Sequence, residues 1–150
     1  LLLLAKIDNK QFDSETFHLN EVLNQSLEIL QEHFEQKNIS VNTEISDNVK
    51  VNGNSGLTEV LINNLILNAI RHTSINGSIS IKLNNSVFEV SNSGTEKLNS
   101  DLLFKRFSRF SKDNNGSGLG LAIVQEICKS QNWTINYRFE NNNHIFSVKL

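Results

Sequence analysis

The longest apolar segment of the sequence, residues 56–73, most restricts what this chain can fold into. Its apolar residues recur with helical spacing, so we predict a helix that is largely buried. These residues are Leu57, Val60, Leu61, Leu65, Ile66, Ala69 and Ile70. A buried helix needs other elements to cover it, and a chain of 150 residues with 38% hydrophobic residues can build one core of that size. We therefore expect a single compact domain organised around this helix.

Segments on both sides of this helix alternate between apolar and polar residues, as half-buried strands do. We predict one hairpin around Asn84-Asn85 and another around Asn141 to Asn143. Further strands are expected at 16–19, 39–45 and 49–51, the last two forming a hairpin that ends at Asn52-Gly53. The order of elements predicts a mixed sheet with the helices packed on one face.

Two more amphipathic helices are expected. The first has Asn20 as its N-cap, and its apolar residues are Leu23, Leu27, Leu30 and Phe34. The second follows a glycine cluster and contains Leu121, Val124 and Cys128. Residues 1–10 resemble the end of a further amphipathic helix, with a tag or frayed terminus as the alternative. They are too short for a membrane span and do not form a signal peptide.

Composition excludes several classes of function. Fourteen basic and sixteen acidic residues give a net charge of −2, which disfavours nucleic acid as a partner. The lone Cys128 cannot form an internal disulfide, and no Cys and His residues have zinc-site spacing, so we expect a reducing compartment. There is no Pro, so turns must rely on the 23 Asn residues together with Ser and Gly. The absence of Met leads us to expect that the chain is part of a longer protein.

Four polar residues share one face of the predicted central helix: Asn64, Asn68, Arg71 and His72. An asparagine inside a buried helix lowers stability unless its amide is hydrogen-bonded or binds an ion. Two such residues one turn apart, followed by a cation, indicate a binding site. The alternative is a solvent-facing stripe in a sequence that uses Asn often.

The second candidate site is a glycine cluster where a loop becomes a helix. Gly116, Gly118 and Gly120 would let backbone N–H groups approach an anion at the positive end of that helix. The cluster is neither a Walker loop nor a complete dinucleotide fingerprint. A glycine-rich hinge is an equally good explanation of this motif by itself.

Two further segments lie between these motifs. Asn92 and Gly94 follow a strand, where an amide can present a hydrogen-bonding edge to a planar ligand and a glycine permits close approach; an Asx turn is the alternative. Residues 103–110 interleave phenylalanines with Lys105, Arg106 and Arg109, as a mobile lid over a phosphate would, although a basic surface strip is equally ordinary.

Together these motifs resemble the catalytic ATP-binding domain of sensor histidine kinases. Residues 64–73 resemble the asparagine box, 92–94 the first glycine box, 104–107 the phenylalanine box and 116–121 the second glycine box. Order and spacing both agree, and residues 1–12 resemble the end of the dimerisation and phosphoacceptor helix, which leaves 13–150 as the catalytic domain. The resemblance implies an α+β fold of the Bergerat type, a two-layer sandwich whose mixed, mostly antiparallel sheet is covered on one face by three helices.

The resemblance also implies ATP and Mg²⁺ as cofactors and a role for each matching residue. Asn68, supported by Asn64, would hold the metal, and Arg71 would contact phosphate. Asn92 would contact adenine, with Gly94 and His72 also beside the nucleotide. Lys105 and Arg106 are catalytic lid candidates, as is Arg109. The remaining implied nucleotide contacts are Phe107, Gly116, Gly118, Leu119, Gly120 and Leu121.

The chain departs from the family pattern in ways that bear on function. Asn92 replaces the usual Asp and Glu96 the usual second glycine, and the lid, residues 108–115, is short. None of the four histidines, His18, His33, His72 and His144, has the flanking Glu and Pro of an acceptor box. We therefore expect the acceptor histidine on a separate helical domain upstream.

The resemblance finally implies partners and a location. We expect the kinase to transfer the γ-phosphate of ATP to that helical domain for relay to a response regulator. The full-length protein is expected to be a homodimer on the cytoplasmic side of a membrane, and this chain alone a monomer. A module that binds ATP or a partner without transfer is the alternative. ATP hydrolysis is disfavoured because it needs a carboxylate one turn before Asn64, where Val60 stands and Glu59 is out of phase.

Overall fold

A computed structural model describes residues 3, 6–7, 12–94, 97–98, 103–104 and 120–150. Within these residues the helices are α2 (Leu19–Ile29), α3 (Gln31–Gln36), α4 (Ser55–His72) and α5 (Gly120–Ser130). The strands are β1 (Glu15–His18), β2 (Ser40–Ile45), β3 (Lys50–Gly53), β4 (Ser78–Leu83), β5 (Val87–Ser93), β6 (Thr134–Glu140) and β7 (Asn143–Lys149).

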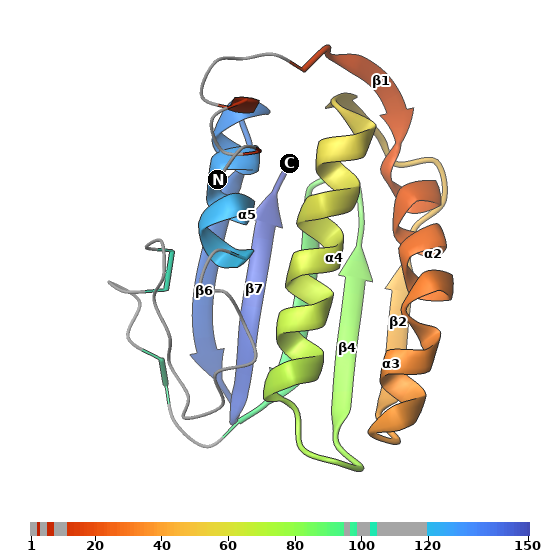
Figure 1. Ribbon diagram of the computed structural model, residues 1–150, viewed down its shortest axis with the longest axis vertical. Coiled ribbons are helices and arrows are strands. Elements are labelled where there is room, and N and C mark those ends of the chain that lie inside the picture. The colour runs from red at the N-terminus through yellow and green to blue at the C-terminus, as the bar shows by residue number, and fades with distance from the viewer. Residues whose placement is uncertain (1–2, 4–5, 8–11, 95–96, 99–102, 105–119) are drawn as a thin grey trace.

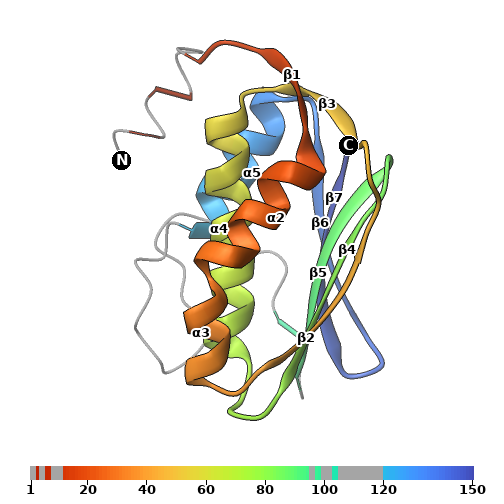
Figure 2. The same cartoon turned by 90° about the vertical axis from the view of Figure 1, so that its right-hand side faces the viewer.

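The main sheet has five strands in the order β2-β4-β5-β7-β6 (Figure 1). Only β2 and β4 are parallel, and every other neighbouring pair in this sheet is antiparallel. All the labelled helices lie on one face of this sheet (Figure 2). The predicted two-layer α+β sandwich with a mixed, mostly antiparallel sheet is therefore confirmed, and α2 with α3, α4 and α5 form its helical layer.

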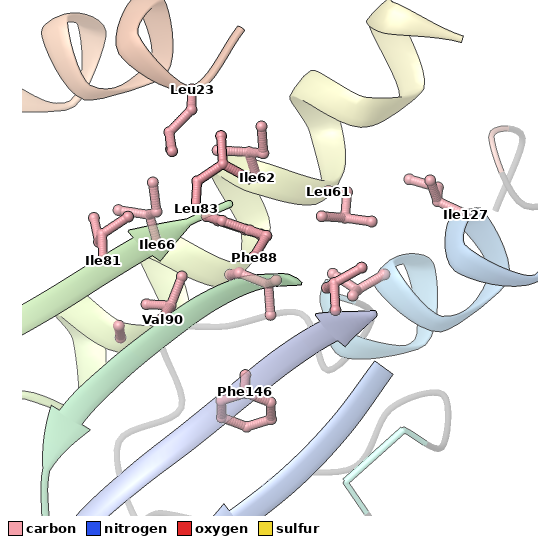
Figure 3. Packing of buried hydrophobic residues seen from close by; sticks show 14 of the residues in the cluster. Leu23, Leu61, Ile62, Ile66, Ile81, Leu83, Phe88, Val90, Ile127 and Phe146 are labelled. Atoms are coloured by element: carbon pink, nitrogen blue, oxygen red, sulfur yellow. The ribbon is translucent and has the colours of Figure 1, made fainter. Parts of the chain in front are cut away.

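The core lies between this helical layer and the inner face of the sheet. Leu61, Ile62 and Ile66 of α4 face Leu83 and Phe88 of the central strands (Figure 3). Each of these side chains is at most 2% exposed. Burying one side chain of this size contributes about 1.5–3 kcal/mol. The predicted apolar helix is thus the centre of the fold, as its composition indicated.

Asparagines form the tight turns, as the lack of proline predicted. Every non-glycine residue with positive φ in the described part of the chain is an asparagine: Asn38, Asn48, Asn76, Asn132, Asn141 and Asn142. Asn141 and Asn142, with φ of 51° and 58°, connect β6 to β7 as the two-residue turn of a hairpin. The hairpins β4–β5 and β6–β7 are both confirmed.

The predicted hairpin between residues 39–45 and 49–51 is wrong. β2 pairs with β4, whereas β3 pairs with β1 in a separate two-stranded sheet. Ser46 continues the β2–β4 ladder by donating its N–H to the Leu83 carbonyl oxygen at 2.9 Å. The carbonyl oxygen of Val49 accepts a hydrogen bond from the Leu19 N–H at 2.8 Å, which directs the chain to β1. Alternation indicated two strands correctly but did not identify their partners.

The predicted start and continuity of the first helix also need correction. α2 begins at Leu19 with His18 as its N-cap, because the Asn20 side-chain oxygen instead accepts the Val49 N–H at 2.9 Å. The helix is interrupted at Leu30, where ψ is 2°, before α3 continues. Leu30 and Phe34 are nevertheless both buried, since apolar spacing reports burial and not unbroken backbone hydrogen bonds.

Little of the N-terminal segment falls within the described residues. Leu3, Lys6 and Ile7 are helical, and Ile7 is 4% exposed and belongs to the core cluster. The division of the chain near residue 12 into the end of one helix and a catalytic domain remains a prediction. None of the helices in the described ranges is long and apolar enough to cross a membrane.

Candidate functional site

The polar stripe predicted on α4 lies on the side of the helix away from its most buried residues. Asn64, Asn68, Arg71 and His72 are all half-buried, whereas Leu65, Ile66, Ala69 and Ile70 are buried. Asn54 caps the start of α4 by accepting the Leu57 N–H at 2.9 Å. The cap and the buried face together fix the rotation of the helix, so the stripe has a defined position beside the core.

Asn64 connects α4 to the first residue of α5. Its amide nitrogen donates to the Val60 carbonyl oxygen at 2.7 Å. Its amide oxygen faces Gly120, where a Cβ would lie only 3.0 Å from that oxygen. The two helices lie side by side (Figure 1). The structure therefore brings together one residue of the asparagine stripe and one of the glycine cluster, motifs 56 positions apart in sequence by their numbers.

The groups on the two sides of this contact favour ligands of opposite charge. Gly120 is at the N-terminal end of α5, where unpaired N–H groups and the helix dipole favour an anion. The amide oxygens of Asn64 and Asn68 are hard donors that suit a magnesium ion. The described residues contain no cluster of three or more His, Cys, Asp or Glu side chains that could hold a metal. Amide oxygens carry no net charge, so a metal held by Asn64 and Asn68 would also need negatively charged groups, such as the phosphates of a ligand.

The carboxyl end of α4 is held by a lysine from another element. Lys37 follows α3, and its Nζ donates to the carbonyl oxygens of Ile70 at 2.8 Å and Arg71 at 3.3 Å. A cation at this end of a helix satisfies terminal carbonyl groups and interacts favourably with the helix dipole. Lys37 thus fixes the end of α4 that carries Arg71 and His72. Sequence reasoning missed it, because the lysine is more than thirty residues away and has no local signature.

Asn92 and Gly94 lie at the end of β5, the central strand of the sheet. Asn92 is 3% exposed, and its amide nitrogen donates to the Ser93 carbonyl oxygen at 3.3 Å. The Gly94 N–H donates to the Asn142 carbonyl oxygen at 2.8 Å. A Cβ on Gly94 would collide with Nε2 of His144, so only glycine fits there. The group that approaches this glycine is an imidazole of the protein itself, and the approach of a ligand there remains a prediction.

His144 is the second residue of this site that sequence reasoning missed. It is 8% exposed and lies directly opposite Asn92 in the β5–β7 register. Burial lowers the pKa of its imidazole below the ordinary value, which favours the neutral ring. The sequence analysis considered His144 only as a phosphate acceptor. Only the pairing of strands that are not consecutive could have placed it beside Asn92.

Several predicted site residues lie outside the described residues. These are Lys105, Arg106, Phe107, Arg109, Gly116, Gly118, Leu119, the lid at 108–115 and Glu96. Gly120 and Leu121, which begin α5, are described, and Leu121 is 8% exposed. Glu59 is exposed and lies outside the stripe, and the turn before Asn64 presents the Val60 carbonyl oxygen. That ATP hydrolysis is disfavoured remains a prediction.

Two other ionisable groups with shifted pKa values, Cys128 and Glu89, do not serve this site. Burial raises the pKa of the Cys128 thiol to about 12, so this thiol is unreactive at neutral pH. Glu89, on the outer face of the sheet, is partly buried, which acts to raise its pKa. Hydrogen bonds from Ser147 and Arg138 outweigh that effect and hold the pKa below the ordinary value. Neither residue offers a nucleophile or base to the α4–α5 site.

Comparison with known proteins agrees with this geometry. Residues 53–150 match the family described as histidine kinase-, DNA gyrase B-, and HSP90-like ATPase. The chain is 32% identical over 150 residues to the heme sensor protein HssS of Staphylococcus aureus strain Newman, a match that covers 94% of this chain. It spans only 32% of that relative, or about a third of its length.

Solved structures show the same arrangement of elements. The catalytic domain of histidine kinase ThkA is similar with a TM-score of 0.79 and 26% identity, covering 93% of this chain and 95% of that domain. The Acinetobacter baumannii histidine kinase AdeS has a TM-score of 0.81 and 24% identity, covering 99% of this chain and 73% of that one. A structure of ThkA in complex with the response regulator protein TrrA has a TM-score of 0.73 and 24% identity, covering 99% of this chain and 46% of that one.

Proposed function

Since this chain belongs to the histidine kinase-, DNA gyrase B- and HSP90-like ATPases and is the ATP-binding domain of a sensor histidine kinase, we propose a specific activity for it. It binds ATP together with magnesium and transfers the γ-phosphoryl group to a histidine on a separate helical domain. A response regulator then receives the phosphoryl group.

The contact between Asn64 and Gly120 is the observation that supports this proposal most directly. It joins the helix with two amide side chains to the start of α5, as a site for a metal-bound polyphosphate requires. In phosphoryl transfer the protein acts mainly by positioning the reactants and neutralising charge. Asn68 and Asn64 would hold the magnesium ion, whose role is to neutralise phosphate charge. Arg71 would contact phosphate, and Gly120 with Leu121 would contribute the N-terminal end of α5.

The other assignments follow from family membership. His72, Asn92, Gly94, Phe107, Gly116, Gly118 and Leu119 would complete the nucleotide pocket. Lys105, Arg106 and Arg109 would contribute lid cations for the terminal phosphate. The whole protein is proposed to be a homodimer with its kinase part on the cytoplasmic side of a membrane.

Titration with ATP in the presence and absence of magnesium tests the binding step. Asn68→Ala should weaken binding at least tenfold in magnesium, about 1.4 kcal/mol, and change it little when the metal is chelated. Glu59→Ala is the control, because it truncates an exposed side chain on the same helix outside the stripe. Equal affinity of wild type and Asn68→Ala in magnesium would contradict the assignment.

A transfer assay tests the kinase activity itself. The chain, given labelled ATP and a phosphoacceptor helical domain of a sensor histidine kinase, should place acid-labile phosphate on that domain. The chain alone should acquire none, because its four histidines lack an acceptor box. A stable phosphohistidine on the chain itself would contradict this reading.

Asn92 favours a second candidate function, a module that binds nucleotide or a partner without transfer. An amide in place of the family's carboxylate changes the hydrogen-bonding edge available to the base. Nucleotide binding without transfer to any supplied acceptor domain would support this second function.

A further inference from the structure

The side chain of His144 lies where several parts of the site meet. It belongs to β7, faces the inner side of the sheet and is opposite Asn92 of β5. The ring of Phe139 packs beside it, with centroids 5.1 Å apart, and the ring of Tyr137 stacks on it at 5.9 Å and 25°. The position of the imidazole is therefore determined by its neighbours.

A chain of hydrogen bonds joins this imidazole to Leu98 through the Tyr137 hydroxyl. The hydroxyl of Tyr137 accepts the N–H of Leu98 at 3.0 Å and lies 2.8 Å from Nδ1 of His144. A hydroxyl can donate one proton while it accepts, so the Tyr137 hydroxyl can donate to Nδ1 of the neutral ring while it accepts the Leu98 N–H. Nδ1 then acts as acceptor, and the neutral ring carries its proton on Nε2, the atom packed against Gly94.

The arrangement connects the segment that follows β5 to the β6–β7 hairpin. Gly94 is held by its N–H bond to Asn142 and by contact with the imidazole, and Leu98 is held by Tyr137. Asn92, the residue assigned to the base, is two positions before Gly94. The imidazole therefore contacts the backbone two residues after the residue assigned to the base.

We propose that His144 is a positioning residue of the nucleotide site, whose neutral imidazole, held by Tyr137, fixes the Gly94 backbone and thereby the base-binding end of the pocket. This inference rests on the proposed function, since it assumes that the pocket binds ATP. Protonation of His144 would place an N–H opposite the Tyr137 oxygen, so the hydroxyl would have to turn its proton away and accept from both Nδ1 and the Leu98 N–H, which changes the geometry of this hydrogen-bond chain. Nucleotide affinity should then fall as the pH drops through the pKa of His144.

The groups that surround His144 allow a pH dependence of nucleotide affinity to be attributed to this residue. Burial lowers its pKa from the ordinary value of 6.5, so the decrease should occur below that pH. Among the described residues packed around it, Asn92 of β5 and Phe139 of β6 do not titrate. Tyr137 is the titratable residue in contact with it, and the side chain of Lys97, next to Leu98 in sequence, is exposed.

The test measures ATP affinity in magnesium between pH 5 and 8 for wild type, Tyr137→Phe and His144→Phe. His144→Phe keeps a ring but removes the acceptor, whereas Tyr137→Phe removes only the hydroxyl. We expect each to weaken binding by about three- to tenfold at pH 7.5. The wild type should lose up to about tenfold more affinity per pH unit below the pKa of His144 than His144→Phe does. The protonation of ATP itself cancels in that comparison.

Arg138→Gln is the matched control, because it changes the neighbour of Tyr137 on the outer face of the same strand, and it should follow the wild-type profile. If His144→Phe does not fold, the proposal is tested instead by the pH profile of Tyr137→Phe and by an NMR titration of the His144 ring in the wild type. Parallel profiles of wild type and variants, with ATP still bound, would overturn this inference alone. Failure of the wild type to bind ATP at any pH would overturn the proposed function as well.

Discussion

The two ends of the inner face of β5 and β7 differ in chemistry although they belong to the same pair of strands. At one end Phe88 pairs with Val148, and both are at most 1% exposed. At the other end Asn92 pairs with His144, and these are also buried, at 3% and 8%. The pleat is continuous, so the difference arises only from side-chain identity. A binding site can thus be an extension of the core in which polar groups replace apolar ones.

This difference predicts that the apolar end affects the free energy of unfolding, whereas the polar end affects the free energy of nucleotide binding. The apolar end contributes to folding, because its residues belong to the buried hydrophobic cluster. The polar end contributes less to folding but presents hydrogen-bonding edges. Substitutions at the two ends should therefore separate stability from nucleotide binding, and the following changes test that separation.

Phe88→Ala should have the largest effect, on stability. It removes a fully buried ring from the central strand and should reduce the free energy of unfolding by about 3–5 kcal/mol. Chemical denaturation followed by circular dichroism measures this loss. The fraction that remains folded should bind ATP with wild-type affinity. A loss of ATP affinity without a loss of stability would contradict the prediction that the apolar end affects folding and not nucleotide binding.

Asn92→Asp should affect selectivity at the other end of the same strand. A carboxylate only accepts, so it suits adenine's amino group and repels guanine's carbonyl, whereas an amide can flip to match either base. We expect the ratio of ATP to GTP affinity to rise by a factor equivalent to about 1–3 kcal/mol, by analogy with contacts to base edges. Competition titration in magnesium measures this ratio. An unchanged or lower ratio would show that Asn92 does not face the base.

Lys37→Met tests whether the carboxyl end of α4 is stabilised by the hydrogen bonds that Lys37 donates to it. The variant keeps the aliphatic stem but loses two hydrogen bonds to the carbonyl oxygens of Ile70 and Arg71. We expect a loss of about 1–2 kcal/mol in unfolding free energy. Lys129→Met is the control, because that side chain is 64% exposed and its ion pair within the described residues is an i,i+3 pair with Glu126. Equal effects of both substitutions would show that the contacts of Lys37 do not stabilise the helix end.

Ser26→Ala tests a polar group placed among apolar ones and should have the smallest effect. The Ser26 hydroxyl on α2 is fully buried and has no hydrogen-bond partner in the described part of the chain. Removing it should raise the free energy of unfolding by about 1 kcal/mol. Gln25→Ala, an exposed change on the same helix, should add only a few tenths. A destabilised Ser26→Ala protein would indicate a bond that this hydroxyl makes in solution.

The sequence predicted elements well wherever the signal was local. The apolar spacing of residues 56–73 identified α4, and paired asparagines identified both hairpins. The prediction was wrong where the partner of a strand was distant in sequence. β2 joins β4, and β3 joins β1, because backbone hydrogen bonds at Val49 direct the chain away from a local hairpin.

The features of the candidate site likewise divide into those that follow from local sequence and those that depend on tertiary contacts. The sequence by itself determined that α4 carries a polar stripe and that a glycine must follow β5, because helical spacing and glycine geometry are local properties. Only the tertiary structure decided that Asn64 meets Gly120, that Lys37 holds the end of α4 and that His144 occupies the space beside Gly94. These contacts join residues from different elements, and packing of the helical layer against the sheet sets their positions.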